Sequence, residues 1–142
     1  MERSVVLVKP DGLQRGVVGE VIHRFERKGL RLSGIKMISL DDALLDEWYA
    51  HHKDKSFFPS LKEYMKTAPV VAMLWEGVDA VSTAEAGTVR GDFAMSQQYN
   101  LIHASENKEI AQKEEKLMFL PSEVFSWEKT DYKHIYLKEE LQ

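Results

Sequence analysis

His103, Ser105 and Glu114 have the types and spacing of a histidine that is held in place for chemistry. Residues 100–105 predict a short strand that ends in a polar turn, and residues 107–119 predict a helix with one apolar stripe. Glu114 interrupts that stripe, and a carboxylate on a buried face is costly unless a partner holds it. His103, at the end of the preceding strand, is the nearest candidate partner. Such a pair would keep the histidine in one tautomer and leave its other ring nitrogen free to react.

The same pattern also fits a histidine in the core beside a glutamate with no catalytic role, because structural ion pairs perturb such groups too. Strand alternation places Leu101 and His103 on one face of the predicted strand, and Ile102 and Ala104 on the other. The residue pattern alone therefore leaves a catalytic and a structural interpretation open.

Length and composition limit the class of protein. With 142 residues the chain suffices for a single domain, residues 1–142, with a substantial core. The formal net charge of −4 gives no electrostatic reason to bind nucleic acid or anionic membranes, so a phosphate ligand would need a local cluster of cations. The absence of cysteine excludes disulfides and thiolate catalysis and fits a cytoplasmic protein. We expect neither a signal peptide nor a membrane span, because no apolar run is long enough.

Hydrophobic periodicity and turn signals predict an α+β order of elements. The Lys9-Pro10-Asp11-Gly12 segment reads as a turn in which proline fixes one dihedral angle and glycine permits a positive one. Lys9 would be the last residue of the first strand, and Asp41 or Ser39 would cap the second long helix. The predicted strands cover residues 4–8, 30–40, 69–75 and 100–105, and the predicted helices cover residues 16–28, 41–49, 57–66 and 107–119.

Three segments together resemble the nucleoside diphosphate kinase family. They are Val8-Lys9-Pro10-Asp11-Gly12, Gly87-Thr88-Val89-Arg90-Gly91-Asp92-Phe93, and Asn100-Leu101-Ile102-His103-Ala104-Ser105 followed by Glu114. The resemblance runs from about residue 3 to about residue 128, in the family's order. Together with the element order, it implies a ferredoxin-like sandwich, in which helices cover a four-stranded antiparallel sheet.

The resemblance also implies a function and a set of site residues. It implies ping-pong transfer of a γ-phosphoryl group from a nucleoside triphosphate to a nucleoside diphosphate, through phosphorylated His103 and with Mg²⁺ as cofactor. Glu114 would hold the second ring nitrogen, and Ser105 would hydrogen-bond Glu114. The other residues implied are Lys9 and Arg90 at the phosphates, Asn100 at the ribose, Tyr49 near the histidine, and Phe57 and Leu61 against the base.

The chain departs from the family between Gly77 and Gly87. Only residues 78–86 stand where family members carry about a dozen more, and none of the nine is basic. The missing segment supplies the family's second phosphate-binding arginine, a phosphate-binding threonine and the loop that joins dimers into hexamers. We therefore expect weaker nucleotide binding and a homodimer rather than a hexamer. Gln97 replaces an apolar residue that often lies over the base, which leaves that contact undetermined.

Two other classes of protein share part of this pattern. A degenerate relative could bind nucleotide or carry phosphohistidine in a regulatory or scaffold role, although such a protein would not need the whole set of site residues. A ferredoxin-like RNA-binding module would need a basic sheet face with exposed aromatic residues. The apolar strands and negative charge disfavour it.

Overall fold

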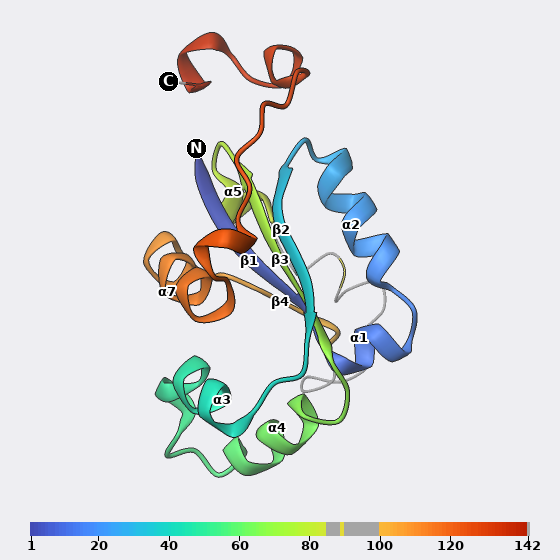
Figure 1. Cartoon of the computed structure of the whole chain (residues 1–142), viewed down its shortest axis with the longest axis vertical. Helices are drawn as coiled ribbons and strands as arrows, with labels where there is room; N and C mark the ends of the chain where they lie inside the picture. The colour runs from blue at the N-terminus through green and yellow to red at the C-terminus, as the bar shows by residue number, and fades with distance from the viewer. Residues whose placement is uncertain (85–88, 90–99, 142) are drawn as a thin grey trace.

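The protein is built on one antiparallel sheet of four strands. The computed structural model describes residues 1–84, 89 and 100–141. Strands β1 (Glu2–Val8), β2 (Arg31–Ile38), β3 (Val70–Gly77) and β4 (Ile102–Ala104) lie in the order β2-β3-β1-β4, and each neighbouring pair is antiparallel (Figure 1). The expected ferredoxin-like arrangement is confirmed.

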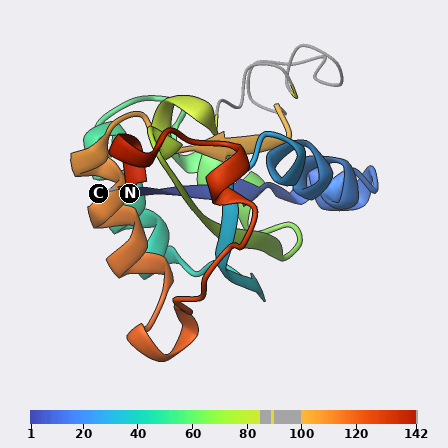
Figure 2. The ribbon, with the colours of Figure 1, turned by 90° about the horizontal axis from the view of Figure 1, so that it is seen from above.

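Helices cover both faces of the sheet, because β1 alternates its buried side chains between two cores. Val6 and Val8 face a cluster with Phe25 of α2, whereas Val5 and Leu7 face a second cluster. Figure 2 shows α2 on one side of the sheet and α7 on the other. The first face carries α1 (Pro10–Gln14), α2 (Val18–Arg27) and α5 (Ala80–Thr83), and the second carries α3 (Asp42–Trp48), α4 (Phe58–Met65) and α7 (Lys108–Met118).

Short 3-10 turns and an extended C-terminal segment complete the described fold. The turns are η1 (Ala50–His52), η2 (Pro121–Glu123), η3 (Tyr132–His134) and η4 (Lys138–Leu141). The C-terminal segment lies along the start of β2, where Phe125 N donates to Ser33 O (2.7 Å) and Trp127 Nε1 donates to Leu32 O (2.8 Å). This segment therefore covers only the first part of the β2 edge.

Two local predictions were wrong. The Lys-Pro-Asp-Gly segment is not a turn, because Lys9 is the N-cap of α1 and Pro10 begins that helix, as its missing N–H allows. Gly12 has no positive φ. Instead, a Cβ there would lie 2.7 Å from Val8 Cγ1 and 2.8 Å from Leu101 O, so glycine permits close packing. Leu101 does not share the face of His103, since it has a φ of 73° and packs in the same core cluster as Ile102.

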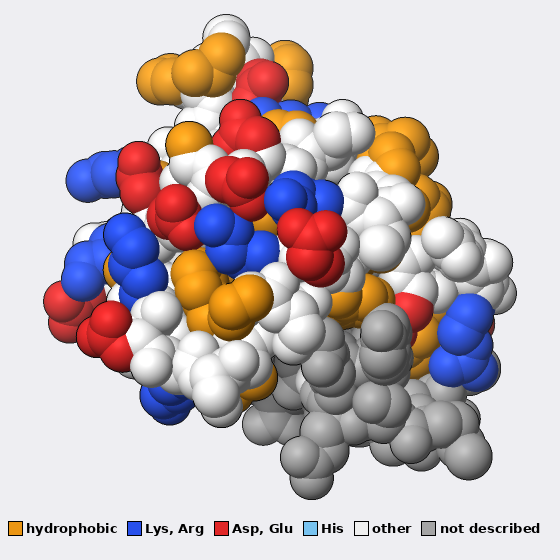
Figure 3. All heavy atoms as spheres, turned by 90° about the horizontal axis from the view of Figure 1, so that it is seen from below, with side chains coloured by type: hydrophobic (Ala, Val, Ile, Leu, Met, Phe, Trp, Pro, Cys, Tyr) orange, Lys and Arg blue, Asp and Glu red, His pale blue; other side chains and the backbone are white. Residues whose placement is uncertain are grey.

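The surface charge is mixed rather than concentrated. On the face drawn in Figure 3, Lys and Arg side chains alternate with Asp and Glu, and no broad area of one sign is seen among the coloured residues. In the part of the chain that the structure describes, no helix has the length and apolarity needed to cross a bilayer.

Candidate active site

His103 and Glu114 form the predicted pair. Antiparallel pairing sets His103 of β4 opposite Leu7 of β1, and Asn107 caps α7 by accepting a hydrogen bond from the Ile110 N–H (2.9 Å). α7 packs on β1 and brings Glu114, whose side chain is 7% exposed, to within hydrogen-bond contact of His103 Nε2. The histidine side chain keeps 20% of its surface exposed. Because Nε2 is engaged, Nδ1 is the ring nitrogen that remains for a ligand.

Ser105 does not make the bond that we predicted. Its Oγ accepts a hydrogen bond from Val5 N (3.0 Å) and donates to Val5 O (3.3 Å). Glu114 Oε1 is buried and has no hydrogen-bond partner among the described residues. The hydroxyl therefore pairs with the N–H and C=O of Val5 on β1, just beyond the end of β4. The residue pattern does not show this backbone partner, which competes with Glu114 for the hydroxyl.

Lys9 and Asn100 are brought together, as the resemblance implied. Lys9 Nζ donates to Asn100 Oδ1 (2.7 Å), and the Lys9 residue is only 7% exposed. The backbone N–H of Lys9 also donates to Leu101 O (2.7 Å), which ties the end of β1 to the segment before β4. A nearly buried ammonium beside a histidine strand can hold the negative charge of a phosphate.

A strained turn that the residue pattern did not predict precedes His103. Leu101 has a φ of 73°, and Ile102 N donates to Asn100 O (2.8 Å) across it. This is a γ-turn with a positive central φ, a rare and strained conformation for a residue other than glycine. Asp11 Oδ2 accepts a hydrogen bond from Leu101 N (3.0 Å). Asp11 and Leu101 lie within the motifs of the resemblance, but neither was predicted to be a site residue.

An aromatic ring that we did not predict lies against His103. The ring centroids of Trp48 and His103 are 5.3 Å apart with an interplanar angle of 68°, an edge-to-face contact. Trp48 ends α3 and is 8% exposed. Tyr49, which we expected near the histidine, is the next residue and is equally buried, and its ring centroid lies 6.0 Å from that of His52.

The residues expected at the base lie around the start of α4. Phe57 is 44% exposed, and Leu61 packs partly against the second core. The ring of His52 contacts Phe57 edge-to-face at 5.3 Å. Burial, together with the charges of His51 and Lys55, lowers the pKa of His52.

Two of the expected positions lie outside the described residues. Arg90, expected at the phosphates, and Gln97, which stands where the family often carries an apolar residue over the base, both fall there. The described residues therefore supply one imidazole with a carboxylate behind it and one nearly buried ammonium, and an exposed aromatic ring stands at the start of α4. An imidazole so held can act as a nucleophile, and the ammonium can stabilise an anionic leaving group.

Comparisons with known proteins agree with this geometry. The nucleoside diphosphate kinase family model matches residues 2–124. A nucleoside diphosphate kinase of Crocosphaera subtropica is 47% identical, with 96% of this chain and 99% of the relative covered. One from Parabacteroides distasonis is 43% identical, with 99% and 100% covered. That second alignment spans 153 positions, more than the 142 residues of the chain, so it places gaps in this chain, as a shortened segment requires.

Solved structures give the same result. A halophilic nucleoside diphosphate kinase from Halobacterium salinarum, in complex with CDP, superposes with a TM-score of 0.91 at 38% identity, covering 96% of this chain and 99% of that one. A nucleoside diphosphate kinase family protein from Babesia bovis superposes with a TM-score of 0.89 at 38% identity, covering 96% of this chain and 100% of that one.

Proposed function

Because the chain belongs to the nucleoside diphosphate kinase family, we propose that it transfers a γ-phosphoryl group from a nucleoside triphosphate to a nucleoside diphosphate through His103. In the first half-reaction, the Nδ1 lone pair attacks the γ-phosphorus. The bond between that phosphorus and the β–γ bridging oxygen breaks, and the nucleoside diphosphate leaves with the bonding electrons. In the second half-reaction, a β-phosphate oxygen of another diphosphate attacks the phosphohistidine and restores the free imidazole.

The observation that carries the proposal is the contact between His103 Nε2 and Glu114 Oε2. A carboxylate there keeps the proton on Nε2, so Nδ1 presents its lone pair without a separate base. When the ring is phosphorylated, the same carboxylate offsets the positive charge that develops on the imidazole. Ser105 contributes by fixing the end of β4 to Val5 of β1.

The remaining roles follow the position of each side chain. Lys9 would bind phosphate oxygens, and Asn100, which already accepts a hydrogen bond from Lys9, would bind the ribose hydroxyls. The exposed ring of Phe57 would stack on the base and Leu61 would pack beside it, without a hydrogen-bond code for one base. Arg90 would complete the phosphate contacts, and Tyr49 would lie near His103.

Magnesium enters this scheme with the nucleotide. Mg²⁺ is usually bound by substrate phosphates together with one or two carboxylates. Among the described residues no group of three or more His, Asp or Glu side chains could hold a metal ion. Mg²⁺ would neutralise charge on the transferring oxygens.

We also propose a homodimer. β2 is an edge strand of the sheet, and Ile35 and Met37 on it are 48% and 62% exposed. An edge strand with exposed apolar side chains is a ready pairing surface for a second copy. Sedimentation should give the mass of a dimer, and Met37→Lys should shift the mass toward a monomer. A hexamer would contradict this part of the proposal.

A coupled assay tests the function. ATP and a second nucleoside diphosphate should yield the second triphosphate, and radiolabelled ATP should leave an acid-labile label on the protein. His103→Ala should abolish both, whereas His23→Ala, at an exposed histidine of α2, should abolish neither. A labelled protein that does not transfer its label would favour the degenerate relative. Label that persists on His103→Ala would refute the assignment.

A further inference from the structure

We propose that Asp11 is a positioning residue that holds the strained turn before His103 and links it to α4. The proposal rests on the proposed function, because it concerns the residues that bind nucleotide and carry phosphate. The strain is local: among the described residues, only Leu101 and Asp79 have a positive φ without being glycine. Such a conformation persists only where surrounding contacts determine it.

Three contacts hold the turn in place. Asp11 Oδ2 accepts the Leu101 N–H at 3.0 Å, and the Lys9 N–H donates to Leu101 O at 2.7 Å. The Leu101 side chain has no exposed surface and is fixed in the core. One of the three contacts is a backbone hydrogen bond and another is a buried side chain of the core. The third, the carboxylate of Asp11, can be removed by a substitution that leaves the backbone bond and the core side chain in place.

The same carboxylate also contacts the helix on the base side of the site. Asp11 Oδ1 accepts a hydrogen bond from the hydroxyl of Tyr64, which lies on α4 and is 5% exposed. α4 is the helix that begins beside Phe57. Two donors from different elements, a backbone N–H and a phenol, therefore converge on one carboxylate with two acceptor oxygens.

The position of the turn makes this link matter for catalysis. Leu101 separates Asn100, which meets Lys9 Nζ at 2.7 Å, from the strand that presents His103. If Leu101 relaxed to a negative φ, the chain direction would change between these two groups, and both would shift relative to Lys9. A displacement of about 1 Å in a reacting group can lower a rate about 10²-fold.

Three variants separate the two hydrogen bonds of Asp11, one to the Leu101 N–H and one to the Tyr64 hydroxyl. Asp11→Ala removes both hydrogen bonds and should lower the rate of His103 phosphorylation by ATP about 10- to 100-fold in a single turnover. Asp11→Asn should lose much less, because its oxygen can accept from Leu101 N while its amide donates to the Tyr64 oxygen. Tyr64→Phe keeps the bond to the turn and should raise KM for the nucleotide more than it lowers the phosphorylation rate.

A double-mutant cycle tests the mechanism itself. Glycine adopts a positive φ without strain, so in a Leu101→Gly background the clamp has no strain to hold, and the lost core contact is common to both variants compared there. Asp11→Ala should then cost less than threefold in rate, against the 10- to 100-fold cost in the wild-type background. Equal costs in the two backgrounds would overturn the proposal.

A control variant and a readout other than activity complete the experiment. Asp46→Ala removes a carboxylate that also binds α4, through Lys62 Nζ at 2.9 Å, but does not reach the turn. It should leave the rate unchanged. Hydrogen exchange of the Leu101 amide should accelerate in Asp11→Ala and not in Asp46→Ala. Unchanged protection of that amide would refute the clamp, and failure of the wild type to form phosphoenzyme would instead refute the proposed function.

Discussion

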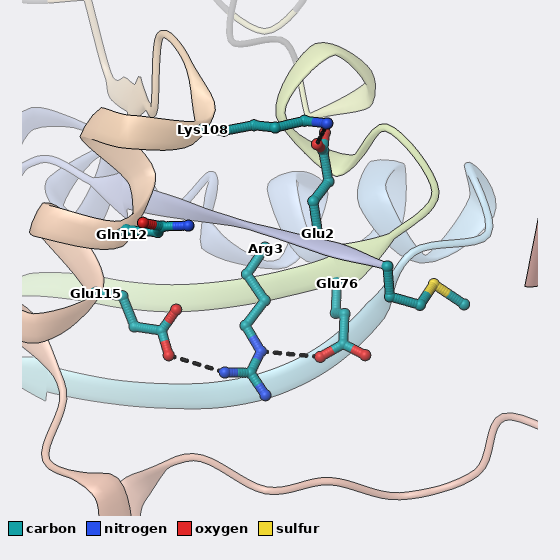
Figure 4. A pocket seen from close by; sticks show the side chains of 7 residues that line it. Glu2, Arg3, Glu76, Lys108, Gln112 and Glu115 are labelled. Carbon is teal, nitrogen blue, oxygen red and sulfur yellow. Dashed lines mark hydrogen bonds and ion pairs between the residues drawn. The ribbon is translucent and has the colours of Figure 1, made fainter. Parts of the chain in front are cut away.

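The two ends of β1 both carry buried charge, but they use it differently. At the N-terminal end, Arg3 Nε lies 2.9 Å from Glu76 Oε2 and Arg3 Nη1 lies 2.9 Å from Glu115 Oε1 (Figure 4). Arg31 contacts the other oxygen of Glu76, so both oxygens of that carboxylate are engaged. These side chains line or adjoin an open cavity of about 560 Å³. Opposite charges there neutralise one another across β1, β2 and β3.

At the C-terminal end the polar groups surround a histidine and a strained turn, whereas at the N-terminal end a buried atom without a hydrogen-bond partner among the described residues, Arg31 Nε, belongs to an ion-paired arginine. Glu114 uses one oxygen on His103, and its other oxygen has no hydrogen-bond partner among the described residues. Leu101 is held in a strained turn next to the buried ammonium of Lys9. We infer from the strained turn and the exposed histidine that the second cluster serves a ligand, whereas the ion pairs of the first cluster stabilise the sheet.

The largest effect is expected from removing the centre of the N-terminal cluster. Glu76→Ala leaves the largely buried Arg31 without its carboxylate, whereas Arg3 keeps Glu115, so the free energy of unfolding should fall by about 3 kcal/mol, the lower end for a broken buried pair. The phosphorylation rate per folded molecule should not change. Urea unfolding measures the first quantity and single-turnover labelling the second. Glu109→Ala, at an exposed glutamate of α7, is the control and should change neither. A loss of rate in Glu76→Ala would remove the distinction between the two ends.

Adjacent glutamates of α7 allow a direct contrast. Glu114→Gln should lower the rate of His103 phosphorylation about 10²-fold, because the charge that orients the ring and offsets its positive charge is lost. Glu115→Gln, one residue along and directed at Arg3, should change that rate less than twofold. Quench-flow labelling with ATP provides both numbers. Similar effects for the two substitutions would show that the phosphorylation rate depends on the packing of α7 and not on the carboxylate that contacts His103.

The sequence predicted most of the fold because its signals are local. The continuous apolar runs of β1 and β3 and the Glu114 in the stripe of α7 are visible in the residue pattern. The strained turn at Leu101 is not, since a leucine carries no signal for a positive φ and its contacts come from residues about 90 positions away. For the same reason the Ser105 partner was wrong and the Trp48 contact was missed.

A smaller effect is expected at the ring that packs on His103. Trp48→Leu should lower the phosphorylation rate by up to about tenfold, because edge-to-face aromatic pairs contribute about 0.5–1.5 kcal/mol. Trp48→Phe keeps an aromatic ring and should retain most of the rate. Leu45→Ala weakens the same helix from its buried side and should leave the rate per folded molecule unchanged. A loss of rate in Leu45→Ala as large as that in Trp48→Leu would assign the effect to helix packing instead.

The smallest effect concerns pH dependence at the N-terminal end. Burial raises the pKa of Tyr132 to about 12, and its hydroxyl donates to Glu76 O (3.3 Å). Since the pKa is about 10 in the unfolded chain, this contribution to stability is complete below pH ~10 and is lost as pH rises toward 12. Tyr132→Phe should therefore flatten the decline of the urea midpoint above pH ~10. An equally steep decline in the variant would contradict the assignment.

The most direct test of the account is to find which ring nitrogen of His103 carries the phosphoryl group. The phosphoenzyme would be formed from ATP, kept at alkaline pH and analysed by phosphorus and nitrogen NMR. Because Glu114 engages Nε2, the account predicts phosphate on Nδ1 of His103. Phosphate on Nε2, or on a residue other than His103, would contradict it.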